Sequence, residues 1–344
     1  MARFVRGSMG AVFAAALLTA AACSSGTGTG SQTPDGGSSS GAPESLSVAF
    51  FGFAKANSFA NATWKGVQKA ASAAGATATF FDGNFDASTQ VSQIQDATVS
   101  HKYNVFVVQA NDGVAVLPAV RQALTAGITV VAEYTPIGTS NDTAAPQVPG
   151  IISVVEVPTD TGTKLGQLAV RACTGINPCR VAWLVGNPTY PPDTTRLDSA
   201  LAVMKSAPNI AVISTSIVGG YTQAQGRTAG QDLFTAHKNV NVVIGSSQAI
   251  EGAYPVAQQL GIAKGIKFIG NGGSTQAVAG VQSGQWFATI YEDEAHSGEL
   301  AMQYGLEAAK GENVPTSTNI LDIAPNHGLG TKSALSGIIA SYSD

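Results

Sequence analysis

The chain has 344 residues, of which 44% are hydrophobic and 12% are charged, so it can form more than one ordinary domain with a sizeable core. This composition excludes a wholly disordered chain and a fibrous repeat. The 18 basic and 22 acidic residues give a net charge of −4, and no basic stripe is present to neutralise phosphates. We therefore expect no nucleic-acid partner and a mildly acidic protein. We also expect a monomer.

The first 23 residues have the layout of a secretory signal. Arg3 and Arg6 precede a small, apolar run at residues 11–22 that is too short to span a bilayer. Residues 18–23 read LTAAAC and resemble a bacterial lipoprotein cleavage site, with Ala20 where leucine is commonest. The alternative is ordinary cleavage at an Ala-x-Ala site, with Cys23 incidental. We expect export, with lipidated Cys23 anchoring the protein to the outer face of the cell membrane.

Residues 24–45 are almost all Ser, Gly, Thr, Pro and Gln, which carry too little apolar surface to offset the entropy of ordering. This segment is predicted to be a flexible tether with a typical span of roughly 25 Å.

From residue 46 onward, short apolar runs alternate with amphipathic stretches. This order predicts parallel strands with helices packed on both faces of the sheet. In the first half, the predicted strands are residues 47–51, 77–81, 105–108 and 128–131, and the predicted helices are residues 59–73, 88–100 and 114–125.

After a Pro-rich polar stretch at residues 136–149, the same alternation restarts. The predicted strands are residues 181–185, 210–216, 240–244 and 266–269, and the predicted helices lie near residues 194–206, 223–237 and 249–260, with another that ends at residue 309. Open parallel sheets bind ligands beyond the carboxyl ends of their strands, so two facing units should surround one site.

Cys173 and Cys179 are six residues apart, with Gly175 and Pro178 between them. In an exported protein this spacing suits a small disulfide-closed loop, and two buried free thiols are the alternative. Neither cysteine has a nearby histidine, so we expect no metal site, and no motif predicts a cofactor.

Four local segments carry a family resemblance. Residues 53–59 (FAKANSF) run into residues 64–71 (WKGVQKAA), and residues 245–253 (GSSQAIEGA) and 288–292 (ATIYE) follow in the second half. Together with the order of elements, from about residue 46 to 325, they resemble the type I periplasmic solute-binding proteins of ABC importers, closest to the ribose/xylose-type sugar-binding branch.

The resemblance implies two Rossmann-like lobes, each a parallel sheet flanked by helices, joined by a three-crossing hinge near residues 153–157, 292 and 320. The N-terminal lobe would comprise residues 46–154 plus about 292–319. The C-terminal lobe would comprise about 155–291 plus 320–344. Such a protein closes on a small solute and delivers it to an ABC permease in the membrane.

The resemblance also implies ligand contacts. Asn57 falls on a polar position and Phe59 on an aromatic position of the first lobe. Tyr221 falls on an aromatic position of the second lobe, Ser246 on a polar contact, and Glu292 on the last polar contact at a crossing.

The chain departs from the ribose-type pattern at three places. Residues 133–135 (EYT) stand where that pattern has an acidic-basic pair. Residues 190–195 stand where it has a cleft arginine, and Arg196 comes just after them. Residues 270–273 (GNGG) lack its cleft acid. The cleft is therefore predicted to be aromatic and neutral polar, with two acids. The further candidate contacts are Phe53, Glu133, Tyr134, Tyr190 and Asn271. A small neutral sugar or polyol suits such a cleft, and a less polar cyclic compound or a cation is the alternative.

Several candidates also have a purely structural interpretation. Asn57 is a possible N-cap and Phe59 a possible core residue of the same helix. Glu133 faces the cleft or the protein interior depending on one residue of strand register. Glu292 is equally suited to the start of the following helix.

Catalysis is not expected, because the sequence shows no Gly-x-Ser-x-Gly elbow, no metal-ligand spacing and no third group to orient a histidine. The remaining alternative is a binding lipoprotein that presents a non-sugar signal molecule to a membrane sensor.

Overall fold

The structure, a computed structural model, describes residues 45–344. The predicted signal peptide, Cys23 and all of the predicted tether except Ser45 lie outside the described residues. Within residues 45–344, no helix combines the length and the apolar character that crossing a membrane requires.

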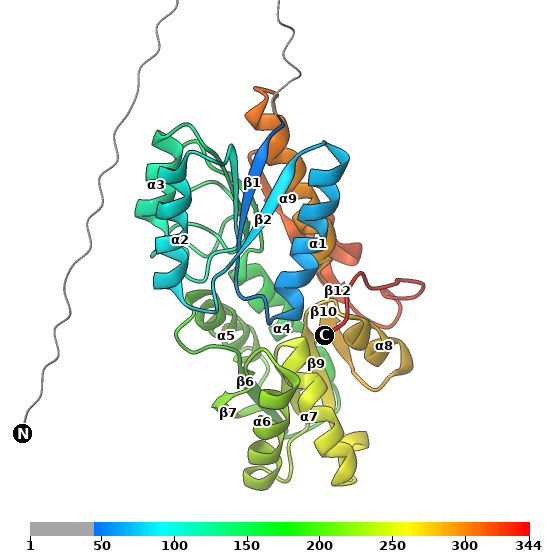
Figure 1. Cartoon of the computed structure of the whole chain (residues 1–344). Helices are drawn as coiled ribbons and strands as arrows, with labels where there is room; N and C mark the ends of the chain where they lie inside the picture. Colours follow the sequence, from blue (N-terminus) through cyan, green and yellow to red (C-terminus); the bar gives the residue numbers. More distant parts are fainter. Residues whose placement is uncertain (1–44) are drawn as a thin grey trace, which may run out of the picture. The chain divides into compact units, whose positions relative to one another are not determined.

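The first lobe is built on a parallel sheet with the strand order β11-β5-β4-β3-β1-β2. Helices α1 and α9 cover one face of this sheet, and α2 and α3 cover the other (Figure 1). Its strands are β1 (Ser47–Gly52), β2 (Thr77–Asp82), β3 (Val105–Val108), β4 (Thr129–Tyr134), β5 (Ile152–Val155) and β11 (Ser317–Asn319), and its helices are α1 (Ser58–Ala73), α2 (Ala87–Ser100), α3 (Leu117–Thr125) and α9 (Glu294–Ala309).

The second lobe repeats this arrangement with the strand order β12-β10-β9-β8-β6-β7, in which only β12 runs antiparallel to its neighbour. Helices α4 and α5 pack on one face, and α6, α7 and α8 on the other. Its strands are β6 (Cys179–Val185), β7 (Ile210–Val218), β8 (Val242–Ile244), β9 (Lys267–Asn271), β10 (Ala288–Ile290) and β12 (Leu329–Gly330), and its helices are α4 (Pro158–Ala172), α5 (Pro191–Met204), α6 (Gln223–Ala236), α7 (Ser247–Gln259), α8 (Thr275–Ser283) and the short α10 (Ile320–Ile323).

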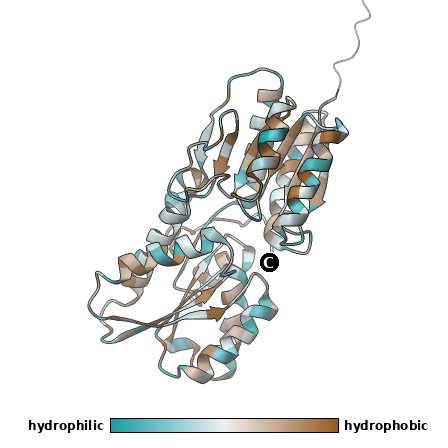
Figure 2. Cartoon of the chain, turned by 90° about the vertical axis from the view of Figure 1, so that its left-hand side faces the viewer, coloured by the Kyte–Doolittle hydropathy of each residue, from teal (hydrophilic) through white to brown (hydrophobic). Residues whose placement is uncertain are grey.

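Strand periodicity explains the two cores of each lobe. In β1, Val48 and Phe50 join the core under α1 and α9, whereas Ala49 and Phe51 join the core under α2 and α3. Because both faces of the sheet are buried at its centre, β1 and β3 are almost continuously apolar, and this pattern predicts them as strands. Figure 2 shows these hydrophobic strands inside the layers and hydrophilic residues along the helices.

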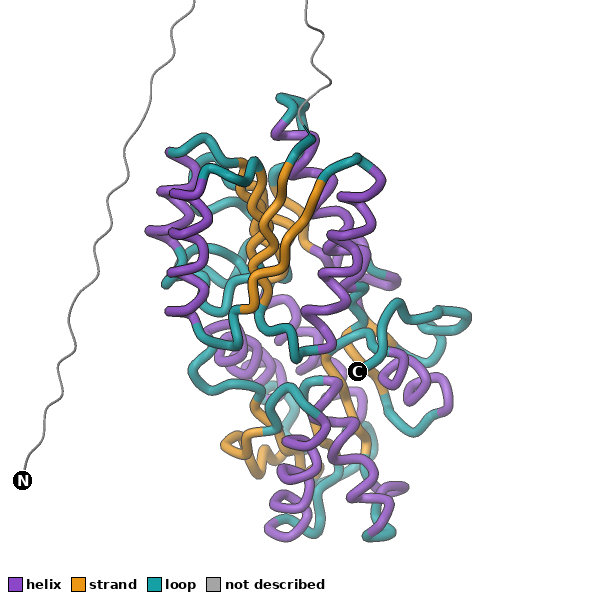
Figure 3. The backbone as a smooth tube through the Cα atoms, in the orientation of Figure 1, coloured by secondary structure: helices purple, strands orange, loops and turns teal. Residues whose placement is uncertain are grey.

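The chain passes between the lobes in three places: from β5 to α4, from β10 to α9, and from β11 to α10. Figure 3 shows the loops that join the strands and helices of the two lobes. Two parallel-dominated sheets flanked by helices confirm the predicted fold class.

Helix α4 was not predicted from the sequence. It starts with Pro158 in its first turn and contains Gly162 and Gly166, which lower the helix propensity of the segment. The structure explains both glycines, because a Cβ at Gly162 would lie 2.3 Å from the backbone oxygen of Arg196, and one at Gly166 would lie 2.8 Å from that of Ala200. The small residues let α4 approach α5 closely.

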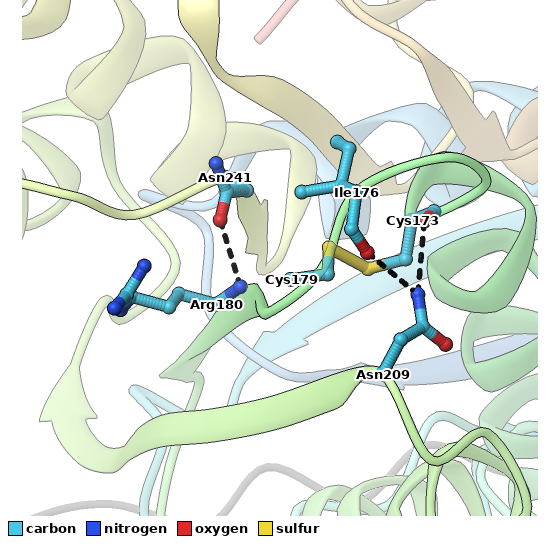
Figure 4. The surroundings of a disulfide bond; sticks show 6 residues. All are labelled: Cys173, Ile176, Cys179, Arg180, Asn209 and Asn241. Carbon is cyan, nitrogen blue, oxygen red and sulfur yellow. Dashed lines mark hydrogen bonds between the residues drawn. A yellow bond between two sulfur atoms is a disulfide. The ribbon is translucent and has the colours of Figure 1, made fainter.

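Cys173 and Cys179 form a disulfide that joins the end of α4 to the start of β6 (Figure 4). The amide of Asn209 donates hydrogen bonds to the backbone oxygens of Cys173 (3.1 Å) and Ile176 (2.8 Å). The loop is therefore fixed both covalently and by hydrogen bonds.

Candidate functional site

A cavity lies between the carboxyl ends of the two sheets. Its free volume is about 70 Å³. On the same measure one water molecule needs about 10–15 Å³, so a small molecule fits. Six aromatic side chains, six neutral polar side chains and one arginine form its wall: Phe53, Phe59, Phe85, Tyr134, Tyr190, Tyr221, Asn57, Asn111, Asn187, Ser246, Gln248, Asn271 and Arg196.

The strand ends explain why these residues meet. In the first lobe, Phe53 and Asn57 follow β1, Phe85 follows β2, Asn111 follows β3, and Tyr134 ends β4. In the second lobe, Tyr190 follows β6, Tyr221 follows β7, Ser246 follows β8, and Asn271 ends β9. Parallel strands bring their carboxyl ends to one edge, so each sheet contributes one side of the cavity.

Most of the predicted contact residues lie in this wall. They are Phe53, Asn57, Phe59, Tyr134, Tyr190, Tyr221, Ser246 and Asn271. Glu133 and Glu292 do not line it. Sequence reasoning missed Phe85, Asn111, Asn187 and Gln248 and placed Arg196 only near the cleft.

Asn57 combines the two roles considered for it. Its Oδ1 accepts a hydrogen bond from the backbone N–H of Ala60 at 2.9 Å and so caps α1. Its buried side chain also lines the cavity. The cap occupies Oδ1, which leaves the amide Nδ2 to serve as a donor toward a bound molecule.

Tyr134 interrupts the alternation of β4. Its φ of 60° lies in the left-handed region, which bulky residues rarely adopt. Val130 and Ala132 face the core under α2 and α3, but the left-handed turn places the Tyr134 ring on the opposite side, 4.6 Å from the Phe59 ring in an edge-to-face arrangement. Backbone strain of this kind is concentrated at functional sites.

Arg196 is buried between the Tyr134 and Tyr190 rings, with its guanidinium carbon 5.7 and 6.0 Å from their centroids. Its Nε donates to Glu156 at 2.8 Å, its Nη1 to Asp193 at 2.6 Å, and its Nη2 to both Glu156 and the Tyr134 hydroxyl. Burial alone would lower the pKa of Arg196, but Glu156 and then Tyr134 and Asp193 raise it well above its ordinary value. Two carboxylates thus compensate the one positive charge in the wall.

Asp193 also fixes Tyr221. The Tyr221 hydroxyl and the backbone N–H of Asn187 both donate to its Oδ2. Gly186 lies under the ring, where an added Cβ would be 2.7 Å from the Tyr221 ring carbon. Burial, and secondarily Asp193, raise the pKa of Tyr221 well above its ordinary value, so the hydroxyl remains a neutral donor.

Phe85 reaches the cavity from an unusual turn. Asn84 and Phe85 have φ values of 48° and 54°, two consecutive left-handed residues after β2. The Phe85 N–H donates to the backbone oxygen of Phe53 at 2.8 Å, which holds the turn. The exposed Phe85 ring is nearly parallel to that of Tyr221 on the other lobe, with centroids 6.2 Å apart. No periodic sequence signal marks such a turn.

The second lobe supplies polar groups in two states. Ser246 is partly used, because its hydroxyl accepts the N–H of Ala249 (3.1 Å) as the cap of α7 and donates its hydrogen to the Gly220 oxygen (2.8 Å), which leaves one lone pair. In contrast, Asn271 Oδ1 is buried and has no hydrogen-bond partner among residues 45–344. An unpaired buried acceptor is costly, so this atom is suited to accept a hydrogen bond from a ligand.

Glu133 lies behind the cavity wall, in the inward orientation of the two that strand register allows. Its register directs the side chain toward α9, where it accepts hydrogen bonds from Ser297 (2.6 Å) and Gln109 (3.0 Å). Burial raises the pKa of Glu133 to about 7, and the two hydrogen bonds oppose the rise.

Glu292 is also outside the wall, at the crossing from β10 to α9. The carboxylate oxygens of Glu292 and Glu294 are buried and have no hydrogen-bond partner in the described part of the chain. Burial raises the pKa of both groups well above the ordinary value, with Glu156 adding to the rise at Glu292 and Glu292 to that at Glu294.

His, Cys, Asp and Glu side chains do not assemble into groups of three or more that could hold a metal ion anywhere in residues 45–344. The Glu133, Glu292 and Glu294 carboxyl groups thus offer no metal centre beside the cavity.

The model of the periplasmic binding protein domain matches residues 48–313. The chain therefore belongs to the periplasmic binding protein family, as the fold and the interlobe cavity indicate. The search of curated proteins gives no significant match.

Solved structures with the same fold include solute-binding proteins of ABC transporters. One from Mycobacterium smegmatis, with bound glycerol, is 24% identical, with a TM-score of 0.73 over 88% of this chain and 100% of that one. One from Actinobacillus succinogenes 130z, with bound D-allose, is 17% identical, with a TM-score of 0.72 over 85% and 100%. The Caulobacter myo-inositol binding protein is 16% identical, with a TM-score of 0.72 over 85% and 95%.

Proposed function

We propose that the chain is the substrate-binding lipoprotein of an ABC importer and that its lobes close on a small neutral sugar or polyol. The observation that carries the proposal is the cavity wall, in which aromatic rings and neutral polar groups surround one arginine whose charge is compensated. A polyhydroxylated ring presents C–H faces to aromatic rings and hydroxyl groups to amides. An anionic ligand would find no uncompensated positive charge in this wall.

Individual roles follow from the aromatic rings and the unused hydrogen-bonding atoms of the wall. Phe59 and Tyr221 would stack on the ligand, Asn57 would donate through Nδ2, and Asn271 would accept through its unpaired Oδ1. Ser246 would contribute a lone pair, because its hydroxyl hydrogen is used by Gly220. Glu292 is left out of the contact set.

The proposed ligand class agrees with the ligands named for the structural neighbours: glycerol, D-allose and myo-inositol. The proposal also includes anchoring through lipidated Cys23, the flexible tether at residues 24–45, and an ABC permease as the partner. The lobes would comprise residues 46–154 plus about 292–319, and about 155–291 plus 320–344.

A thermal-shift series on the full chain tests the ligand class. The probes are glycerol, D-allose and myo-inositol, with cyclohexanol and choline as non-sugar comparisons. A ligand at about 100 times its Kd adds about 2.7 kcal/mol of stability. We expect a saturable shift with D-allose or myo-inositol. Shifts only with cyclohexanol or choline would overturn the sugar and polyol assignment.

The variant Asn271→Ala separates binding from stability. Removing an unpaired buried acceptor should leave the free energy of unfolding unchanged or slightly higher, whereas affinity for the binding probe should fall by about 1–3 kcal/mol. Calorimetric titration and urea denaturation measure the two effects.

Asn209→Ala is the matched control. Asn209 holds the disulfide loop, so this substitution should lower stability without changing affinity. Equal affinity of Asn271→Ala and wild type would remove Asn271 from the site.

A further inference from the structure

Residues 341–344, which we call the strap, run along the second lobe to the space between the lobes. The backbone oxygen of Tyr342 accepts hydrogen bonds from the N–H and the hydroxyl of Thr275, both at 2.8 Å. Gln276 Nε2 donates to the Ser343 hydroxyl at 2.7 Å. The strap is thereby attached to the start of α8, near the C mark in Figure 1.

The Asp344 side chain contacts both lobes. Its Oδ1 accepts hydrogen bonds from Ser58 Oγ at 2.8 Å and Gln248 Nε2 at 2.9 Å, and its Oδ2 accepts one from Ser247 Oγ at 2.9 Å. Ser58 begins α1 in the first lobe, whereas Ser247 and Gln248 begin α7 in the second. Hydrogen bonds to a carboxylate are among the stronger ones, and the positive ends of two helices add to the attraction.

Tyr342 makes a second interlobe contact. Its ring is 96% buried and packs edge-on against Phe59 of the first lobe, with centroids 6.4 Å apart. Its hydroxyl has no hydrogen-bond partner within residues 45–344. The ring, and not the hydroxyl, therefore accounts for this contact.

The strap contacts one cavity residue in each lobe. Tyr342 packs against Phe59 of the first lobe, and Asp344 accepts a hydrogen bond from Gln248 of the second. We propose that the strap is a third component of the binding site, in which Asp344 and Tyr342 hold the lobes closed and position Gln248 and Phe59. Its effect on ligand release rests on the proposed function, whereas its effect on closure does not. Opening the lobes breaks the Asp344–Ser58 hydrogen bond and the Tyr342–Phe59 contact.

Hydrogen exchange on the ligand-free full chain tests closure without any ligand. In Asp344→Ala and Tyr342→Ala, amides at residues 53–60 and 246–250 should exchange about five-fold faster than in wild type, the effect of one lost interlobe interaction. Ser58→Ala should match Asp344→Ala at residues 53–60, and the double variant should add little there, because both single variants remove the same interlobe hydrogen bond.

Three comparisons make this test specific. Tyr342→Phe keeps the ring and should behave as wild type, as should Ile339→Ser, whose side chain is 91% exposed on the preceding segment. Unchanged exchange in β1 shows that each variant is folded. Wild-type exchange at both cavity segments in Asp344→Ala, Ser58→Ala and Tyr342→Ala would overturn the proposal.

A kinetic measurement tests the effect on binding, with myo-inositol as the probe. Asp344→Ala and Tyr342→Ala should dissociate about five-fold faster with little change in the association rate, because the strap acts in the closed state. Equal dissociation rates would overturn positioning by the strap. If myo-inositol does not bind wild type, the ligand assignment fails, and hydrogen exchange alone decides the role of the strap.

Discussion

At the scale of single residues, the charge states of a few buried side chains determine what the cavity can bind. Arg196 is paired with Glu156 and Asp193, so its charge is not available to attract an anion. Glu292 and Glu294 behind the wall have strongly raised pKa values, because burial and neighbouring carboxylates disfavour their ionised forms. The positive charge of the wall is therefore compensated, and the ionised forms of the acids behind the wall are disfavoured.

Glu133 makes stability depend on pH. Its pKa is about 7 in the folded protein, against an ordinary value of 4.5, so between these pH values the folded state binds more protons than the unfolded state. Its contribution is fully present below pH 4.5 and is lost as the pH rises through 7. Relative to Glu133→Gln, wild type should lose about 3 kcal/mol of unfolding free energy between pH 4.5 and 8.

Urea denaturation of both proteins across this pH range measures the effect. The exposed Glu312→Gln variant is the control and should follow the wild-type curve. Parallel pH profiles for Glu133→Gln and wild type would show that Glu133 titrates normally.

At the scale of elements, the close packing of α1 against α9 positions one side of the site. A Cβ at Gly66 of α1 would lie 1.9 Å from the backbone oxygen of Ala295, and one at Gly298 of α9 would lie 2.2 Å from that of Thr63. Helix α1 carries Phe59, and α9 carries Ser297, the partner of Glu133. The spacing between these helices therefore bears on both the aromatic wall and the acids behind it.

Gly66→Ala tests this packing. Alanine favours a helix over glycine by about 1 kcal/mol, but a methyl group against a neighbouring backbone costs about 1–3 kcal/mol or more. With a contact of 1.9 Å the clash should dominate, and we expect a net loss of about 2 kcal/mol in urea denaturation.

Gly265→Ala is the control, since no atom lies within 4 Å of its added Cβ, and it should be close to neutral. If Gly66→Ala is as stable as wild type, the helices can move apart without loss.

At the scale of the whole binding body, residues 45–344, the lobes meet through side chains that surround the cavity. Arg196 of the second lobe donates to Tyr134 of the first, and the Tyr190 hydroxyl lies 2.7 Å from Thr135 Oγ1. Phe85 and Tyr221 stack across the cavity. A ligand that contacts both lobes adds to these interactions and shifts the hinge equilibrium toward closure.

Phe85→Ala should weaken binding of the probe sugar by about 1 kcal/mol, or five-fold, because an aromatic pair contributes about 0.5–1.5 kcal/mol beyond its area. Phe85→Tyr should retain affinity, since it keeps the ring. Calorimetric titration measures both. Wild-type affinity in Phe85→Ala would show that the stacked pair does not stabilise the closed state.

The sequence alone determined the fold class and much of the cavity wall. Buried central strands are continuous apolar runs, and cavity residues such as Asn57, Tyr221 and Ser246 lie within five residues of strand ends, so nearby residues carry the signal. Helix α4 was not predicted because Gly162 and Gly166 lower its helix propensity, and only the contact with α5 explains these glycines.

Only the tertiary structure decided the charge and closure of the site. Glu133 bonds Ser297 across 164 positions, and Ser58 bonds Asp344 across 286, so neither pairing is encoded in a local pattern. The left-handed backbone at Tyr134 turns its ring to the face opposite to the one that strand alternation predicts. The left-handed backbone at Phe85 likewise directs a ring to the cavity without any periodic sequence signal. Local sequence fixes which elements form, whereas packing between distant segments fixes where buried charges and rings point.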